Sequence, residues 1–438
     1  MPNKTDDSSA PRPRNWRGRW PLGIALFVVA GACGSWWVSG MSGDSARSAA
    51  NAQRRTSQNA LADATAAANG VGLTPRHPGF VAVGGSKTDT LELAASTDPK
   101  AQLALWSQRL ARAEEVLENY RKQTIYPFES RPAREHVDQM YPNRFVHEER
   151  RLTNPGQKPS AGVRIRTSQE RIYVVGSETV LFTVSALDWD GNSLPLSITR
   201  AIAEDPPLDG KPSKRNSVAL GFNDEGANGD VAAGDGVVSV RLSPETQGFA
   251  GHAGTIRVSV NLKVGEETGF AFFDIFYTPN PPAVWSVANT AREVVEAGSL
   301  NFYLKAQVRE AGRYVVTGRI DDAKGQPFAL ISFNDEVAAG PHEFKLNLFG
   351  KLLVDEKPAF PLTLRDVDAF LLKPDVDPDR ALMPRLTGKV LMSRSYPLTA
   401  FSEAEWNSEE RERYLAEYGR DVESARAHLE HIRKTLPP

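Results

Sequence analysis

The feature that most constrains this chain is a stretch without charged residues from Trp20 to Gly43. Its apolar part, PLGIALFVVAGACGSWWV, is long enough to cross a membrane, which takes about 20 residues. Four arginines stand just before it: Arg12, Arg14, Arg17 and Arg19. Because such flanks stay in the cytoplasm, we predict a cytoplasmic tail at 1–19 and a transmembrane signal anchor at 20–41. The rest of the chain is then periplasmic, held by a single pass in a bacterial inner membrane.

Two other interpretations of this stretch remain open. A cleaved signal peptide shares the basic flank, the apolar run and the small residues of AGAC. A lipoprotein signal would use Cys33, the only cysteine in the chain, although Ala30 stands where a larger aliphatic residue is usual. Paired tryptophans at 36 and 37 prefer a membrane interface, which favours the uncleaved anchor. All three interpretations export the bulk of the chain.

Composition limits the classes of partner. A formal net charge of −2 creates no field that would attract nucleic acid, so no nucleic-acid partner is expected. A single cysteine excludes disulfides within the chain. The exported part must therefore be held by apolar cores, which need modules of about 100 residues or more. The length of 438 residues leaves room for two or three such modules.

Two regions precede the first module. Residues 42–97 are rich in Ala, Ser, Asn and Thr and predict a flexible spacer, with a weak Ala-rich helix over 45–68 as the alternative. Residues 98–160 predict a helix near 98–123 and then an extended segment. Asp98 is a favoured N-cap, and Pro99 suits the first helical position. The apolar residues of this helix recur at spacings of three and four: Leu103, Trp106, Leu110, Ala113, Leu117 and Tyr120.

The C-terminal region, 399–438, repeats that spacing. Ser402 and Glu405 match a capping box and predict where its helix starts, while Gly419 predicts a kink or a break. The seam consists of Leu415, Tyr418, Val422, Ala425, Leu429, Ile432 and Leu436. Either the two seams pack on each other or on a neighbouring domain, or they hold an oligomer as a coiled coil. Because seams this short rarely dimerise alone, packing within the chain is favoured.

Period-two alternation between the helices predicts half-buried strands, most clearly over 180–186, 256–264 and 300–308. The proline-rich YTPNPPAVW at 277–285 cannot form a central strand and predicts a domain boundary. About seven short strands on each side are typical of an immunoglobulin-like sandwich, with a jelly roll as the alternative. We therefore predict a mainly β protein with two immunoglobulin-like β-sandwich domains, 161–280 and 281–398.

The densest polar motif is FNDEGANGDVAAGDGVVSV, which begins at residue 222. Calcium prefers six to eight oxygen ligands, and glycines let a loop wrap tightly enough to offer them. The candidate metal ligands are Asp224, Asn228, Asp230 and Asp235, and calcium is the candidate ion. The alternative is a long turn whose Asp and Asn side chains cap their own backbone.

This motif resembles the D-D-G-x-x-G-D-x-x-A-G-D-G loop of bacterial surface proteins of the choice-of-anchor X type. The resemblance covers roughly residues 120–395 and includes YPFESRP, RIYVVGSETVLFTV, GRYVVTGRIDDAKGQPFALISFND and LTLRDVDAFLL. The chain departs from the pattern at Asn223, in place of the first acid, and at Glu225, in place of the first glycine. The resemblance implies an extracytoplasmic, anchored β-sandwich protein and no particular activity.

No H-E-x-x-H, G-x-S-x-G, P-loop or paired C-x-x-C motif is present. His428 and His431 are three residues apart but have no cysteine near them, so surface helix residues are the better interpretation. The acids of DVDPD at 375–379 suit a solvated turn, and Asp366 with Asp368 suits a polar strand face better than a glycosidase pair. We therefore expect a non-enzymatic binding or scaffolding protein whose partner is an envelope protein or a glycan. The alternative is a carbohydrate- or peptidoglycan-binding module, or a hydrolase, with its site on the sandwich loops.

Overall fold

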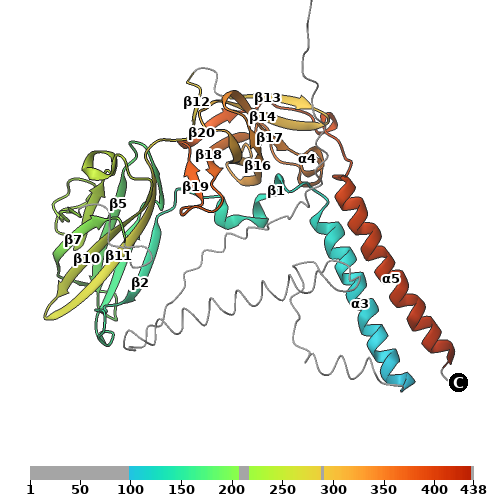
Figure 1. Ribbon diagram of the computed structural model, residues 1–438, viewed down its shortest axis with the longest axis horizontal. Coiled ribbons are helices and arrows are strands. Elements are labelled where there is room, and N and C mark those ends of the chain that lie inside the picture. The colour runs from blue at the N-terminus through green and yellow to red at the C-terminus, as the bar shows by residue number, and fades with distance from the viewer. Residues whose placement is uncertain (1–97, 207–216, 288–290, 436–438) are drawn as a thin grey trace, which may run out of the picture. The chain divides into compact units, whose positions relative to one another are not determined.

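The computed structural model describes residues 98–206, 217–287 and 291–435. The apolar stretch at 20–41 lies outside these residues, so the anchor stays a prediction. Among the described residues, no helix is both long and apolar enough to cross a membrane. The described part is mainly β and carries a long helix at each of its ends (Figure 1).

Residues 146–278 form two sheets around one core, here called the first sheet pair. One sheet has the order β2–β3–β5, with β6 and β9 also on β5, and the other has the order β4–β11–β10–β7–β8. The strands are β2 (Val146–Arg151), β3 (Arg164–Gln169), β4 (Tyr173–Val175), β5 (Val180–Leu187), β6 (Ser193–Leu194), β7 (Leu196–Glu204), β8 (Val218–Ala219), β9 (Val237–Leu242), β10 (Gly254–Val264) and β11 (Glu267–Thr278). A short helical turn, Glu245–Phe249, joins β9 to β10.

Strand β10 shows how the sequence produces this arrangement. Burial alternates strictly along its 11 residues, and β10 pairs with β11 without a break in register. The predicted inward face is confirmed, because Ile256, Val258 and Val260 are fully buried in the first core. The opposite sheet supplies the inward side chains of β5, among them Phe182. Apolar burial of two alternating faces therefore fixes the register.

Residues 283–392 form the second sheet pair, to which a distant strand is added. One sheet contains β14 with β12 and β13 on one side and β17 on the other, and the second has the order β1–β16–β15–β18–β19, with β20 also on β18. The strands are β1 (Ser130–Pro132), β12 (Ala283–Trp285), β13 (Ala291–Glu296), β14 (Ser299–Val308), β15 (Gly312–Asp321), β16 (Pro327–Val337), β17 (Gly340–Leu348), β18 (Thr363–Leu372), β19 (Arg380–Leu382) and β20 (Leu386–Met392).

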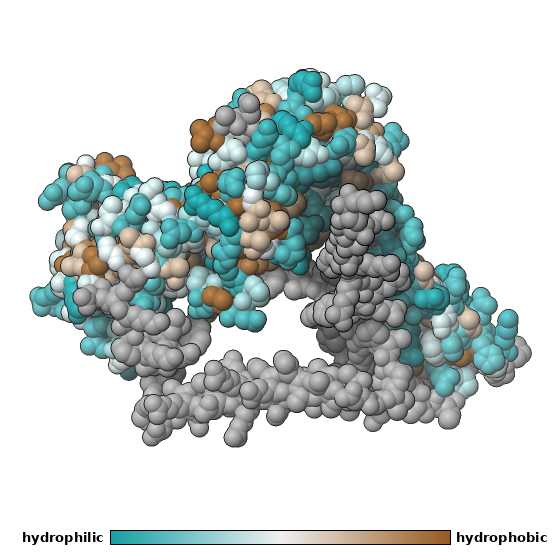
Figure 2. Space-filling model, turned by 45° about the horizontal axis from the view of Figure 1, so that its top comes forward, coloured by the Kyte–Doolittle hydropathy of each residue, from teal (hydrophilic) through white to brown (hydrophobic). Residues whose placement is uncertain are grey.

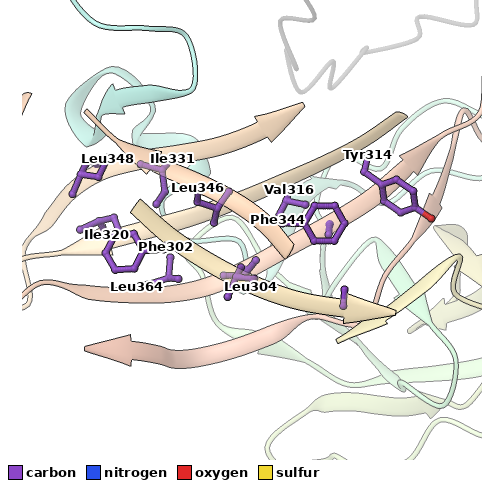
Figure 3. Close-up of a cluster of buried hydrophobic side chains, with 14 of the residues drawn as sticks. Phe302, Leu304, Tyr314, Val316, Ile320, Ile331, Phe344, Leu346, Leu348 and Leu364 are labelled. Atoms are coloured by element: carbon purple, nitrogen blue, oxygen red, sulfur yellow. The ribbon is translucent and has the colours of Figure 1, made fainter. Parts of the chain in front are cut away.

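The second core is built from side chains of both of these sheets. Figure 3 shows Phe302 and Leu304 of β14 and Leu346 of β17 gathered with Val316 of β15 and Leu364 of β18. Tyr314 is fully buried, and its hydroxyl donates to the carbonyls of Pro282 and Glu310, which satisfies the one polar atom of the ring. A short helix, α4 (Gly350–Glu356), closes one end of the core with Leu352 and Leu353.

The two long helices, α3 (Pro99–Gln123) and α5 (Glu409–Thr435), pack antiparallel on each other, as the paired seams predict (Figure 1). Asp98 caps α3 by accepting from the amide of Lys100 at 3.1 Å. Near the free ends the ring of Trp106 stacks on His428 with 4.2 Å between centroids. At the other end Tyr120 meets Tyr418 edge to face at 5.3 Å. The seams are therefore occupied within one chain.

The predicted start of the C-terminal helix is wrong. The helix begins at Glu409, and the hydroxyl of Ser408 accepts from the amide of Arg411 at 3.1 Å. Ser402 instead docks on the second sheet pair, where its amide donates to the carbonyl of Gly298 at 2.9 Å. Gly419 neither breaks nor divides the helix, which continues to Thr435. Tertiary contacts thus override a local capping pattern and a local glycine penalty.

Leu429 tests the seam between the helices, because its side chain is only 4% exposed. Replacing Leu429 by alanine should destabilise the helical pair by about 2 to 5 kcal/mol through lost apolar contact and a cavity. The measurement is thermal unfolding of the full chain followed by circular dichroism. The matched control is His431→Ala, an exposed position on the same turn, which should change nothing. An unchanged melting curve with slower sedimentation would instead mean that Leu429 holds an oligomer.

Candidate functional site

The Asp- and Gly-rich loop, residues 223–236, connects β8 to β9. Its base is closed where the amide of Asn223 donates to the carbonyl of Ser239 at 3.0 Å, and the amide of Ser239 donates back at 2.8 Å. Left-handed backbone falls on glycine at 226, 229, 234 and 236 and on Asn228, whose φ is 55°. Glu225 is not among these positions, so its replacement of a glycine costs no strain there.

Three of the four predicted ligands lie together. Asp224, Asp230 and Asp235 each place one carboxylate oxygen within 4.8 Å of the other two. Calcium–oxygen bonds of 2.3–2.6 Å allow two ligand oxygens to lie up to about 5 Å apart across one ion, so the three oxygens fit a shared calcium. Asp230 is the most buried, at 8% exposed. Asn228, the fourth predicted ligand, belongs to the same loop.

The same carboxylates also bind the loop's own backbone. Asp224 accepts from the amides of Gly234 at 2.7 Å and Gly236 at 3.0 Å, and Asp230 accepts from the amide of Gly226 at 2.7 Å. These bonds are those of a self-capped turn. Oδ1 of Asp224 accepts a second amide, that of Asp235, at 3.2 Å. The two oxygens of Asp230 accept one hydrogen bond each and keep a lone pair for a metal, so this geometry suits either a turn or a turn that also binds calcium.

The charge of the loop bears on these two possibilities. Within the ranges that the structure describes, none of the three carboxylates forms an ion pair with lysine or arginine; the nearby guanidinium of Arg241 lies 3.4 Å from Glu170 instead. Three neighbouring anions that only amides balance repel one another, and a divalent cation would relieve that repulsion.

A calcium titration tests the loop. If Asp224, Asp230 and Asp235 bind the ion, calcium should stabilise the first sheet pair by about 2.7 kcal/mol at a hundred times the dissociation constant. Weak extracellular sites bind at about 10⁻⁴ to 10⁻³ M, so the titration must reach about 50 mM, with magnesium much weaker. The measurement is the melting temperature with each ion.

Asp230→Asn should abolish this calcium shift. The matched control is Asp322→Asn, because Asp322 caps two turn amides, those of Lys324 and Gln326, in a turn remote in sequence from the loop. The control should retain the full shift. If Asp230→Asn lowers the melting temperature equally with and without calcium, Asp230 is only a cap for backbone amides.

The other predicted carboxylate pair is bound by arginines. The guanidinium of Arg319 donates to Asp368 at 2.6 Å, and that of Arg365 donates to Asp366 at 2.8 Å. Asp366 also accepts from the amide of Gly388 at 2.8 Å. A general acid needs a nearby reacting group, whereas these carboxylates are occupied by guanidinium and amide donors of the protein itself. DVDPD at 375–379 forms the turn before β19, where Asp379 pairs with Arg380 at 2.7 Å.

The two histidines of α5 do not lie together as metal ligands. His428 stacks on Trp106, and its Nδ1 lies 2.8 Å from the carbonyl oxygen of Ser424. Among the described residues, the three aspartates of the 223–236 loop are the only group of three His, Cys, Asp or Glu side chains close enough to share an ion.

A row of aromatic side chains on β11 was not predicted. Phe270, Phe272 and Phe276 occupy alternate positions that point away from the core, and Phe272 is 45% exposed. Tyr173 of β4 stacks on Phe276 with 5.5 Å between centroids. Water-facing positions normally carry polar residues, so the alternation in FAFFDIF was the signal available in the sequence.

Polar groups stand beside this aromatic row. Arg257 of β10 lies 4.7 Å from the ring centroid of Phe272 and donates two hydrogen bonds to Asp274, at 2.8 and 2.7 Å. These bonds raise the pKa of the Arg257 guanidinium above its ordinary value. Asn261 of β10 lies opposite Phe270. The outward face of this sheet therefore combines apolar rings with fixed hydrogen-bonding groups. Figure 2 shows that the visible surface is largely hydrophilic, with scattered hydrophobic residues.

Comparisons with known proteins are sparse. No protein-family model and no curated protein matches the chain. A DUF4785 family protein from Legionella pneumophila is 12% identical over 52% of this chain, with a TM-score of 0.36, and the chain spans 57% of that protein's length. Trypsin-activated alpha-2-macroglobulin from Escherichia coli is 13% identical over 53% of this chain and 16% of its own, with a TM-score of 0.20.

A third solved structure contains the FN1–FN3 domains of chicken CNTN1. It is 14% identical over 57% of this chain and 78% of its own length, with a TM-score of 0.18. Scores this low support no argument about function.

Proposed function

We propose that this chain is a non-enzymatic, membrane-anchored periplasmic protein whose two sheet pairs form a binding or scaffolding module. The observation that carries the proposal is the state of Asp366 and Asp368. The sequence offered these residues as a possible acid/base pair but favoured a polar strand face, and both carboxylates accept hydrogen bonds from arginines. Asp366 is held further by Asn143, whose side-chain amide donates to it at 3.0 Å.

Strand order supports an immunoglobulin-like topology for both sheet pairs. In the first, β3 pairs with β5 while the next strand, β4, runs parallel to β11 in the opposite sheet. In the second, β12, β13, β14 and β17 face a sheet in which β16, β15, β18 and β20 are neighbours. Domains of this kind commonly bind through outward sheet faces and loops. The resemblance to choice-of-anchor X proteins supports the same interpretation.

Calcium is part of this proposal. The carboxylates of Asp224, Asp230 and Asp235 would hold the ion, with Asn228 as a further oxygen donor from the same loop. The bound ion would screen the repulsion among the three carboxylates and stiffen the loop between β8 and β9. The role proposed for it is structural.

The anchor is tested by topology. A reporter that is active only in the periplasm, fused after Pro438, should be active, because the basic flank keeps only residues 1–19 inside. The protein should stay in the membrane fraction after a salt wash. Cys33→Ser should leave that retention unchanged; release into the soluble fraction would establish the lipoprotein alternative. A C-terminus found in the cytoplasm would overturn the localisation.

One observation favours a second function, a carbohydrate-binding module for an envelope glycan. Sugar rings present apolar C–H faces and hydroxyl edges, so they suit a surface that alternates aromatic rings with hydrogen-bonding side chains. The β11 row offers Phe270 and Phe272, with Arg257 and Asn261 beside them. This function needs no catalytic group.

A sedimentation assay with insoluble peptidoglycan tests this second function. If the row binds glycan, Phe272→Ala should weaken binding by roughly tenfold, because stacking contributes on the order of 1 kcal/mol or more. Trp189→Ala is the control. Trp189 is also an exposed aromatic residue, at 50% exposed, but it lies in the loop after β5, a strand of the opposite sheet. Equal losses in both variants would mean nonspecific adsorption, and no binding by the unaltered protein would exclude peptidoglycan.

A further inference from the structure

We propose that residues 133–143, here called the strap, form a releasable latch on the outer face of the second sheet pair. The strap follows β1, whose residues Ser130–Pro132 add a short strand to β16. It continues through two helical turns, Ala133–Glu135 and Val137–Gln139, and then leads into β2. It therefore determines the path of the chain from the helical pair to the first sheet pair. The inference does not rest on the proposed function.

Two arginines donate hydrogen bonds to the backbone of the strap. The Nε of Arg319 donates to the carbonyl of Gln139 at 2.8 Å, and the Nη1 of Arg365 donates to the carbonyl of Met140 at 2.9 Å. Arg319 is 5% exposed, so the strap helps to cover it. Side chains of the strap add to these backbone bonds: Arg134 pairs with Glu356 of α4 at 2.7 Å.

Both arginines have charge partners that do not belong to the strap. Arg319 also pairs with Asp368 at 2.6 Å, and Arg365 pairs with Asp321 at 2.5 Å and with Asp366 at 2.8 Å. All of these acids belong to β15 or β18. Release of the strap therefore exposes charges that are already paired. A buried charge without a partner would be costly, and release of the strap leaves none.

Apolar attachment of the strap is small. Met140, at 1% exposed, packs with Ala133 and Leu330 in a cluster separate from the two main cores. Val137 is 61% exposed and Tyr141 is 41% exposed. Because segments with few buried apolar contacts open at lower free energy than the core, the strap should open while the sheets stay folded.

The sheet beneath the strap holds a strained residue. Asp366 has a left-handed φ of 46° and lies where the pairing of β18 with β20 shifts register. Its carboxylate accepts from Asn143 of the strap, Gly388 and Arg365. Its carbonyl accepts from Arg319. Strain of this kind persists only where the surroundings impose it, and it gathers at segments that switch. Opening of the strap removes one of these four contacts, that from Asn143.

Hydrogen exchange of the full chain, read by mass spectrometry, tests the latch. Peptides that cover the strap include the amides of His136 and Gln139, which are hydrogen-bonded within its turns. If the strap opens alone, these amides should exchange about a hundredfold faster than those of β15. Equal protection of strap and β15 would overturn the proposal without any variant.

Met140→Ala sharpens the test. Removing this buried side chain should speed strap exchange by about thirtyfold or more and leave exchange in β15 unchanged, because only local opening becomes easier. A parallel rise in both segments would mean that the strap unfolds only with the core, and would refute the latch. Val137→Ala is the matched control at an exposed position of the strap and should change neither segment.

Discussion

Strict alternation of side chains along the central strands is the constraint on which the rest of the structure depends. On β10 every second residue is buried, and its pairing with β11 contains no break. A slip of one residue would turn the apolar set toward water, so the register of the whole first sheet pair is fixed by burial. The same constraint operates on β14, whose Leu300, Phe302 and Leu304 are fully buried. Two filled cores follow from two such strands and the sheets opposite them.

Filled cores leave function to the outer faces and loops. Three features of the described residues occupy such positions: the 223–236 loop between β8 and β9, the aromatic row of β11, and the strap on the sheet that contains β15 and β18. Each departs from an ordinary polar surface in a different way. The loop concentrates negative charge, the row exposes rings, and the strap covers arginines that would otherwise face water. A protein with two well-packed cores tolerates these three surface features, because each of them lowers the free energy of unfolding only slightly.

Local patterns in the sequence predicted the elements well and their long-range partners poorly. The cap at Asp98, the seam of α5 around Val422 and the inward faces of β5, β10 and β14 were predictable, since period and capping are local. The true start of α5 was not predictable, because Ser402 is hydrogen-bonded to Gly298, about a hundred positions away in sequence. Nor could the sequence reveal that Arg319 bonds the carbonyl of Gln139, at a separation of 180 residues. The three aspartates of the loop were found because they are neighbours in sequence.

Charge balance explains why two groups of aspartates differ in their capacity to bind a cation. Asp366 and Asp368 lie on a strand flanked by arginines, so each negative charge is neutralised where it stands and has little to gain from a cation. Asp224, Asp230 and Asp235 are balanced by amide dipoles, which direct partial positive charge at the oxygens without cancelling a full one. A divalent ion would therefore be bound more favourably by the loop than by the sheet face. The backbone bonds also limit the affinity for a cation, because each amide that a carboxylate oxygen accepts leaves that oxygen with fewer lone pairs for a metal.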